Sequence, residues 1–507
     1  MAHVQDIRER AGVEADRPAT DSRRALWLLL GPVLFVLTSV LPPPDGVAPA
    51  GMPALGIFLW TAVWWVSEVV PMPVMGLLAL ALLGLTGVVT TDQAFSYWSH
   101  WVVVFLLGAF VIGHALTIHG LTRRFAFRLV AHPIVAGNAW RLAALLLCGA
   151  AFLSTLMSNV VVTMVFMAIA EGVLEAVRIS RSARYGGALF LGIAWASGVG
   201  GIGTPVGCPA NLIAIGLAQK LGYSIGFLQW SLIGLPLAAV GMIVMLTIFR
   251  FMVGDDLPNL TGSQEYARRE LQTMGPLGRG EKVALMALLV ALLLWLLPDL
   301  ARLVLGPTAP LVIWLDSHLN WAVVSILVAT SLFFIPIDWR RRQFAMTWSD
   351  VVQGIEWGTL ALVAGALAVG TVLGDPKIGW GKYFTNHLLA AVPGSQSTML
   401  FVLVIVAAIV VTTNFISNNA VVAAFGALVL AMSSSQQFVP DPLALLVVVG
   451  ITSSMAFALP SAAPYCAMVF ASGRVRMSMM VRYGSILGAA MTLLACAAYP
   501  LARFVLR

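Results

Sequence analysis

The chain of 507 residues is 60% hydrophobic, and only 10% of its residues are charged. Soluble domains carry about 25% charged residues, so this composition excludes a soluble globular protein and predicts an integral membrane protein. The net charge of +7 does not indicate a nucleic-acid partner, because the Lys and Arg residues cluster in short loops between apolar segments instead of on one binding face. The four cysteines show no CxxC or Cys/His metal spacing, so neither a disulfide framework nor a zinc site is expected.

The first expected elements are a polar tail and a group of membrane-spanning helices. Residues 1–24 are polar and basic, and no small-residue cleavage site closes the apolar run after them. We therefore expect a cytoplasmic tail before an uncleaved first helix. Each following apolar run approaches the ~20 residues that cross a bilayer. These runs are Ala25–Leu41, Leu55–Val70, Met72–Thr90 and Trp101–Ile118.

A long apolar stretch then lies between two groups of arginines. Arg123–Arg141 precede it and Arg178–Arg184 follow it, and two basic groups are both expected in the cytoplasm. We therefore interpret residues of about 137–176 as a hairpin that enters and leaves on the cytoplasmic side. An interrupted apolar segment at about 187–220 follows. The first repeat, residues 25–252, is then separated from the rest by a polar cytoplasmic loop at 253–282.

Residues 283–507 are expected to form a second repeat of opposite orientation. Its hairpin, at about 397–432, enters and leaves on the outside, and an interrupted segment at about 442–472 follows. With both hairpins, 23 of the 29 Lys and Arg residues lie in the cytoplasm, in agreement with the positive-inside rule. The predicted fold is an all-α polytopic membrane protein with about eleven transmembrane helices plus two re-entrant hairpins in two inverted-topology repeats.

The two repeats share a polar motif inside their hairpins. A hydroxyl residue is followed after three residues by Ser-Asn, at Ser154–Asn159 and again, 259 residues later, at Thr413–Asn418. An interrupted segment rich in Gly or Pro follows each motif, at Gly200–Asn211 and at Ala458–Cys466. Broken helices expose N–H groups that bind anions, and their free carbonyls, with Ser, Thr and Asn oxygens, suit a small cation. Such segments in matching positions of two halves indicate a transporter's binding site.

Each motif taken alone has a simpler explanation. A single Ser-Asn pair is usually a polar contact between packed helices, and a single Gly-Pro segment is usually a kink. The paired occurrence in inverted positions favours a binding site over both explanations.

These motifs resemble those of a known family, the divalent anion/sodium symporters, which include dicarboxylate, citrate and sulfate carriers. The likeness covers nearly all of the chain after about residue 30. Trp64–Pro73 is similar to the family's WWxTEaiPlP signature, and the two Ser-Asn sites are similar to its paired Ser-Asn-Thr motifs. Gly200–Ile213 resembles its GTxxxGTPPNLI run, and Leu459–Val469 resembles its LPxxTPPNAIV run.

The resemblance implies a secondary transporter of a small anion in a bacterial-type inner (plasma) membrane, coupled to sodium and without an organic cofactor. It implies a homodimer in which a transport domain moves like an elevator against a fixed scaffold domain, with one sodium ion per repeat. By matching positions, the sodium ligands would be Ser154, Ser158, Asn159, Gly203 and Gly207 in the first repeat and Thr413, Asn418 and Ala462 in the second. The substrate-binding residues would be Ser158, Asn159, Val160, Cys208, Pro209, Ser417, Asn418, Asn419, Ala463 and Pro464.

The chain departs from the family pattern on the substrate side. Val160 and Asn419 replace the threonines of the two Ser-Asn-Thr motifs, and Cys208 and Ala463 replace those of the two TPP segments. Each lost hydroxyl removes a hydrogen bond worth about 0.5–1.5 kcal/mol, although Asn419 and the nearby Tyr465 supply new donors. We expect an anion with one strongly bound charged end: an atypical carboxylate, sulfate or a sulfonate. The alternative is that ordinary di- or tricarboxylates are held mainly by backbone N–H groups and serine.

The chain has four other polar residues near apolar segments, and its pattern also bears on three other classes of function. Glu68 and Glu356 lie beside apolar segments, where an ionisable group is a functional candidate, but Glu68 belongs to the family signature and is expected to end a helix. His114 and His119 are interpreted as interfacial. An enzyme is not expected, because no nucleophile–base pair or paired carboxylates are visible. A channel would need a repeated filter. A sodium-independent anion exchanger on the same fold remains the alternative.

Overall fold

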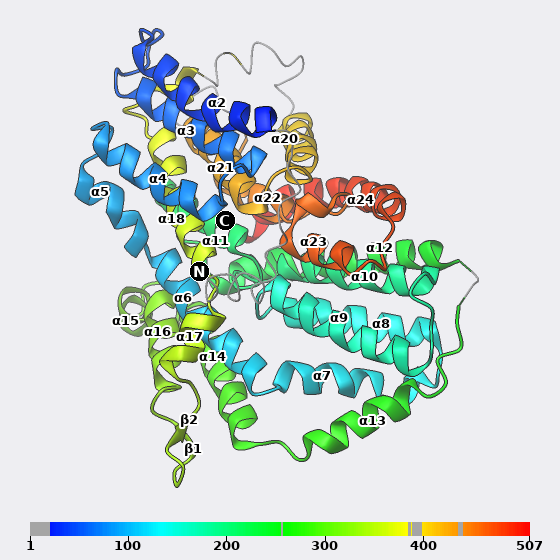
Figure 1. The fold of residues 1–507 in the computed structure, drawn as a ribbon. Coiled ribbons are helices and arrows are strands. Elements are labelled where there is room, and N and C mark those ends of the chain that lie inside the picture. The colour runs from blue at the N-terminus through cyan, green and yellow to red at the C-terminus, as the bar shows by residue number, and fades with distance from the viewer. Residues whose placement is uncertain (1–20, 255–256, 384–386, 388–397, 434–439, 507) are drawn as a thin grey trace, which may run out of the picture.

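The computed structural model describes residues 21–254, 257–383, 387, 398–433 and 440–506, and this part of the chain is predominantly helical (Figure 1). The tail predicted at residues 1–24 lies almost wholly outside the described residues. The expectation of an all-α protein is wrong at one place, where β1 (Pro336–Asp338) and β2 (Gln343–Phe344) pair antiparallel. The turn between them carries three arginines, whose charge favours a position outside the bilayer.

The first helices form a group of their own. They are α2 (Asp21–Val40), α3 (Gly51–Ser67), α4 (Met72–Leu85), α5 (Thr91–Ser96), η1 (Tyr97–Ser99) and α6 (Trp101–Ile118). α2 packs along α3, and α4 packs along the much later helix α18 (Trp357–Leu373). α2 begins before the expected Ala25, because hydropathy marks only the apolar part of a helix and polar residues extend it.

The first half contains two interrupted units, one at 139–176 and one that begins at Arg184, three residues before the predicted 187–220. Residues 155–158 separate α8 (Ala139–Ser154) from α9 (Asn159–Ala176), and residues 202–208 separate α10 (Arg184–Gly201) from α11 (Pro209–Ala218). α8 packs against α9 and α10. The neighbouring elements are α7 (Leu121–Val130), η2 (Pro133–Val135), η3 (Gln219–Leu221) and α12 (Phe227–Val253).

The segment predicted as a polar loop at 253–282 contains a helix, α13 (Ser263–Met274), among its described residues. α13 packs against α7 and α9 and buries Ala267, while Arg123 of α7 reaches Glu270 at 2.6 Å. Its polar composition indicated a loop, but charged residues at helical spacing also suit an amphipathic surface helix. Packing against α7 and α9 stabilises this segment as a helix and not as a loop.

The second half repeats the pattern of interrupted units. Residues 414–417 separate α20 (Thr398–Thr413) from α21 (Asn418–Ser433), and residues 454–463, which include η4 (Pro460–Ala462), separate α22 (Pro442–Ser453) from α23 (Pro464–Ala471). The other elements are α14 (Arg279–Leu305), α15 (Pro310–His318), α16 (Trp321–Ser331), α17 (Trp348–Gly354) and α24 (Met477–Val505).

Five segments of the described chain are long and apolar enough to cross a membrane, and up to seven are when each bent helix pair is taken as one span. The bent pairs are α15 with α16, at 65°, and α17 with α18, at 62°. Several further helices are apolar but shorter, including α8, α20 and α21. The chain is therefore an integral membrane protein with many apolar helices, and the count of eleven spans stays a prediction.

Two helices lie at the centre of the molecule. Every residue of α10 from Tyr185 to Gly201 is buried, and so is every residue of α22 from Leu443 to Ser453. Helices that are apolar on all sides and rich in small residues are buried on all sides. α10 packs between α8 and α12, and α22 packs against α11, α21 and α24. The breaks that follow α10 and α22 are thereby held in the interior of the protein.

Candidate functional site

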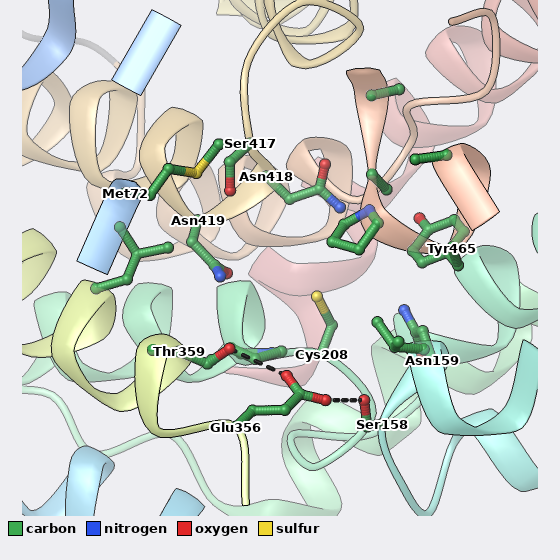
Figure 2. Close-up of a pocket in the computed structure, with 18 of the residues that line it drawn as sticks. Met72, Ser158, Asn159, Cys208, Glu356, Thr359, Ser417, Asn418, Asn419 and Tyr465 are labelled. Atoms are coloured by element: carbon green, nitrogen blue, oxygen red, sulfur yellow. Dashed lines mark hydrogen bonds between the residues drawn. The ribbon is translucent and has the colours of Figure 1, made fainter. Parts of the chain in front are cut away.

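A cavity of about 520 Å³ lies where the breaks of the four interrupted units meet (Figure 2). One side of it is formed by the first turns of α9, α11, α21 and α23. The other side is formed by the connection from α3 to α4 and by the first turn of α18. The side chains that Figure 2 labels come from both sides: Met72, Glu356 and Thr359 on one, and Ser158, Asn159, Cys208, Ser417, Asn418, Asn419 and Tyr465 on the other.

Four helices begin at this cavity. Asn159, Pro209, Asn418 and Pro464 are the first residues of α9, α11, α21 and α23, and all four line the cavity. The preceding residues of three of them, Ser158, Cys208 and Ala463, do not cap the helix with a side-chain hydrogen bond. Uncapped first-turn N–H groups and the positive end of the helix dipole attract anions. The cavity therefore has the electrostatics of an anion-binding site on this side.

The motif of the first repeat forms a compact cluster of oxygen atoms. The Ser154 hydroxyl hydrogen-bonds the side-chain amide of Asn159 across the break between α8 and α9. The same amide lies 3.2 Å from the Ser197 carbonyl and 2.9 Å from the Gly207 carbonyl. Ser154 is fully buried and Asn159 is nearly so. Two side chains and two backbone carbonyls thus converge beneath the cavity.

Glycines allow this cluster to close. A Cβ at Gly207 would meet the Ser154 carbonyl at 2.7 Å and would also collide with the Gly201 carbonyl. A Cβ at Gly201 would lie 2.6 Å from the Asn159 amide. The break between α10 and α11 is further fixed by Asn211, whose amide donates to the Gly201 carbonyl at 2.9 Å and to the Thr204 carbonyl at 2.8 Å. Only residues without side chains bring the two breaks this close.

The motif of the second repeat makes the same contact. The Thr413 hydroxyl lies 3.0 Å from the amide oxygen of Asn418, and 2.6 Å from the Ser453 carbonyl at the end of α22. Thr413 is fully buried and Asn418 is 8% exposed. The amide oxygen of Asn414 accepts a hydrogen bond from the Ala458 N–H at 2.8 Å and joins this break to the one after α22. The two half-sites therefore share one local construction.

The structure brings the residues that the sequence singled out into one place. All ten expected substrate-binding residues line the cavity, as do the expected sodium-site residues Gly207 and Ala462. Ser154 and Thr413 lie directly behind it, through their bonds to Asn159 and Asn418. Gly203 does not line the cavity, and its carbonyl lies close to Gly234 on α12.

Sequence reasoning left Glu356 without a role, and the structure places it in the cavity wall. Its carboxylate accepts hydrogen bonds from Ser158 at 2.8 Å and from Thr359 at 3.0 Å. The only signal in the sequence was a carboxylate beside an apolar segment. Glu68 ends α3 in a left-handed backbone conformation, as a helix-end residue, and also lines the cavity.

Two polar groups of the cavity wall are buried without a partner. The amide oxygen of Asn419 accepts no hydrogen bond from the described residues, and the Tyr465 hydroxyl, beside Asn418, forms none of standard geometry there. Buried polar groups are normally satisfied, and an unsatisfied one costs about 1–3 kcal/mol. Both residues differ from those of the family at the same positions on the substrate side. A bound ligand is one means of supplying their missing hydrogen bonds.

The donor atoms at the site are hydroxyl, amide and carbonyl oxygens. Within the described residues, no group of three or more His, Cys, Asp or Glu side chains is placed to hold a metal ion. Neutral oxygen clusters formed by unwound helices and their side chains are the type that holds Na⁺ in transporters. The residues present therefore fit a sodium ion and do not resemble a transition-metal centre.

A model of the family described as sodium:sulfate symporter transmembrane region matches residues 23–501. The sodium-dependent dicarboxylate transporter SdcS of Staphylococcus saprophyticus is 27% identical over 468 residues, which cover 90% of this chain and 87% of the relative. SdcS of Staphylococcus aureus (strain USA300) is 26% identical over 471 residues, with coverage of 90% and 87%.

Two solved transporter structures share the fold at low sequence identity. MtrF of Neisseria gonorrhoeae has a TM-score of 0.53 at 14% identity, and the match covers 93% of this chain and 94% of that one. The YdaH transporter of Alcanivorax borkumensis has a TM-score of 0.50 at 14% identity, with coverage of 94% and 96%. At this identity the likeness concerns the fold alone.

Proposed function

Because the chain belongs to the sodium:sulfate symporter family, we propose that it carries a small anion across the membrane together with sodium. The protein is a membrane transporter of this family and not an enzyme. The observation that carries the finer proposal is the twin contact of Ser154 with Asn159 and of Thr413 with Asn418, at two helix starts that open on one cavity.

The anion is held by the side of the cavity where four helices begin. The N–H groups at the starts of α21 and α23 face it with Ser417, Asn418 and Asn419. The unsatisfied Tyr465 hydroxyl can donate to an anionic group, and the amide nitrogen of Asn419 is a further donor, whereas the Asn419 atom without a partner is its oxygen, an acceptor. In the first repeat the apolar Val160 stands at the position of Asn419, and the thiol of Cys208 stands at the position of Ala463. This asymmetry supports an anion with one strongly bound end: a carboxylate, sulfate or sulfonate.

Ordinary dicarboxylates are the alternative substrate. The SdcS proteins of the two staphylococci are named as dicarboxylate transporters, and a second carboxylate would then rest on the backbone N–H groups at the starts of α9 and α11. Ser158 also lines that half of the cavity, but its hydroxyl donates to Glu356. Both halves lack two of the family's threonine hydroxyls, but Asn419 and Tyr465 supply replacement donors only in the second half, which favours the one-ended anion.

The first sodium position is the oxygen cluster around Asn159. With its amide turned, the nitrogen of Asn159 donates to the carbonyls of Ser197 and Gly207 and to the Ser154 hydroxyl oxygen. The grouping of these hydroxyl, amide and carbonyl atoms at a helix break supports a sodium position here. We assign Ser154, Asn159 and these carbonyls to the site, with Ser158 beside them. The carbonyl of Gly203 is not included, because it faces α12.

The second sodium position is built around Thr413 and Asn418. The Ser453 carbonyl lies within 2.6 Å of the Thr413 hydroxyl, and the backbone near Ala462 lines the same side of the cavity. A sodium ion bound at each position supplies positive charge beside the anion and couples its movement to the sodium gradient. The protein's own part is to hold neutral oxygens at fixed positions behind the helix starts.

The arrangement of the cavity also supports a division into two domains. One wall comes from the interrupted units α8–α11 and α20–α23, and the other comes from α3, α4 and α18. We propose that the interrupted units form a transport domain, built from two inverted repeats that each contain a re-entrant hairpin. This domain would move like an elevator against a scaffold domain. The same proposal includes a homodimer in the inner (plasma) membrane with a cytoplasmic N-terminus.

A sodium-independent anion exchanger is the competing function, and ligand-dependent stability separates the two. The melting temperature of the purified protein would be measured with succinate, sulfate, isethionate, aspartate and taurine, in sodium salts and in choline salts. A ligand at 100 times its Kd adds about 2.7 kcal/mol to the free energy of unfolding. Stabilisation in sodium alone supports symport, whereas equal stabilisation in choline supports the exchanger.

A further inference from the structure

The carboxylate of Glu356 projects into the cavity wall at the start of α18 (Figure 2). It accepts one hydrogen bond from Ser158 at 2.8 Å and one from Thr359 at 3.0 Å, one at each carboxylate oxygen. Two hydroxyl donors suit an ionised carboxylate, which only accepts hydrogen bonds. Each oxygen keeps a free lone pair for a further donor.

The charges around the cavity are one-sided. Glu68 and Glu356 are among the residues that line it, while no Lys, Arg or His of the described chain does so. An anion that entered without a positive group of its own would face these carboxylates with only sodium ions as counter-charges. A carboxylate at membrane depth usually pairs with a cation or binds a transported ion or substrate. The described cavity lining has no cationic side chain, so a cationic partner for Glu356 has to come from the ligand or from a bound sodium ion.

The two halves of the cavity suit groups of opposite charge. The second-repeat half has donors for an anion, namely the amides of Asn418 and Asn419 and the first-turn N–H groups of α21. In the first-repeat half, Val160 and Cys208 stand where the family has threonines, and the Ser158 hydroxyl donates its hydrogen bond to Glu356. This half therefore presents an acceptor, not a donor, to a ligand.

We propose that the substrate is a zwitterion, whose carboxylate or sulfonate binds the second-repeat half and whose ammonium group pairs with Glu356. This inference rests on the proposed transport of a small anion and specifies the chemical group at the end of the substrate opposite the anionic group. A charge-assisted hydrogen bond from an ammonium group to a carboxylate is among the stronger contacts available at a binding site. The volume of about 520 Å³ accommodates an amino acid or an amino sulfonate.

Proton binding by Glu356 is the competing reading, and it makes a different prediction. A small cavity on the far side shares Ser158 and Glu356 with His114, and Asp350 lies near His114. If a proton neutralised Glu356 during transport, simple anions would bind as well as zwitterions and would bind better at low pH. The contacts of Glu356 with Ser158 and Thr359 fit either form, because a hydroxyl group can donate or accept, so the ligand pairs below decide between the two.

Matched pairs of ligands test the inference in sodium buffer. The pairs are taurine against isethionate, β-alanine against propionate, and aspartate against succinate, in which one member carries the ammonium group and the other lacks it. The melting temperature of the purified full-length protein is followed as each ligand is titrated. The ammonium member of at least one pair is expected to reach half-maximal stabilisation at a tenfold lower concentration. Equal or better stabilisation by the members without nitrogen overturns the inference.

Variants at Glu356 tie the preference to this carboxylate. Glu356→Gln is expected to remove the tenfold preference, and Glu356→Asp is expected to retain part of it. Glu265→Gln neutralises an exposed carboxylate on α13 and serves as the matched control. If Glu356→Gln fails to fold, the matched pairs in the wild-type protein at pH 5.5 and 7.5 decide alone. Stabilisation by simple anions that rises on acidification then favours the proton and overturns the zwitterion.

The two levels of the proposal fail in different ways. If simple anions stabilise the protein in sodium but not in choline, without a preference for ammonium, sodium–anion symport survives and the zwitterion does not. If a zwitterion stabilises equally in choline, Glu356 recognition survives and sodium coupling does not. If no member of any pair stabilises the protein, the zwitterion inference is overturned, and the wider anion panel then decides the proposed function.

Discussion

The hydroxyl of Thr413 lies 3.0 Å from the amide oxygen of Asn418, across the break between α20 and α21. Ser154 and Asn159 make the same contact across the break between α8 and α9, with the same spacing of five residues. Each contact ties the end of one helix to the start of the next, beside a buried helix that also ends in a break. This shared construction places both half-sites at one cavity.

Removing the hydroxyl of Ser154 should weaken sodium binding without unfolding the protein. One oxygen ligand or hydrogen bond is worth about 1 kcal/mol, so Ser154→Ala should raise the sodium concentration for half-maximal stabilisation about fivefold. Titration of the melting temperature with sodium chloride, at constant ionic strength, measures this. Ser231→Ala is the control, because Ser231 is a buried serine on α12 whose hydroxyl bonds the Phe227 carbonyl in its own helix. A similar shift in both variants would contradict the assignment.

The second half-site should respond in the same way. Thr413→Val keeps the shape of the side chain and removes the hydroxyl that contacts Asn418 and the Ser453 carbonyl. We expect a comparable loss of sodium affinity, of about five- to tenfold. Thr61→Val provides the control, since the Thr61 hydroxyl is buried but bonds only within α3. Unchanged sodium dependence in Thr413→Val would remove this residue from the second position.

A methyl group at Gly207 should disrupt the first half-site. The added Cβ would meet the Ser154 and Gly201 carbonyls, and such overpacking costs about 1–3 kcal/mol. Gly207→Ala is therefore expected to lower the melting temperature and to abolish its dependence on sodium. At Gly370 the nearest atoms to an added Cβ lie 3.4 Å away, so Gly370→Ala should keep sodium dependence. Normal sodium dependence in Gly207→Ala would show that the glycine contact is not required.

Restoring the lost hydroxyls should shift the substrate preference toward dicarboxylates. Val160→Thr with Cys208→Thr returns two donors to the first-repeat half of the cavity, each worth about 0.5–1.5 kcal/mol. Stabilisation by succinate should then need about a tenfold lower concentration than in the wild type. Val161→Thr, which changes a neighbouring residue that does not line the main cavity, is the control. If succinate binding is unchanged in the double variant, these departures do not set the substrate.

A buried ion pair should hold the first hairpin to the C-terminal helices. Arg474, whose side chain is 1% exposed, bonds both carboxylate oxygens of Glu171 on α9. The Glu171 side chain is 25% exposed, so removing it costs less than the ~3–5 kcal/mol of a fully buried pair. It still leaves the buried Arg474 charge without this partner, so Glu171→Ala should lower the melting temperature clearly. Arg181→Ala removes an exposed partner of the same carboxylate and should cost under about 0.5 kcal/mol. Similar melting temperatures for the two variants would contradict this account.

Local sequence patterns were sufficient for the helix breaks and for most of the residues that line the cavity. The spacing of Ser154 and Asn159 and its repetition at Thr413 and Asn418 act within a few residues, so they can be read from the chain. The expected substrate residues meet in one cavity because each stands at the start of a helix. The repeated motif in the sequence therefore predicted that its two copies lie at one cavity.

Contacts between distant segments could not be read in this way. Glu356 reaches Ser158 over 198 positions of sequence, and no local pattern indicates such a partner. The carbonyl of Gly203 faces α12 because of how that helix packs, although its motif position suggested a sodium ligand. Helix α13 forms where hydropathy indicated a loop, because α7 and α9 supply the surface on which it packs.

Coupled flux of sodium and the anion through the protein decides between symport and exchange. The protein would be reconstituted into liposomes, and uptake of ²²Na⁺ and of the labelled anion that stabilises it most would be measured together. The account predicts that both enter, that an inward sodium gradient drives accumulation of the anion, and that each flux falls to background when the other solute is replaced by choline or chloride. Anion uptake that continues undiminished in choline would contradict sodium coupling and identify an exchanger.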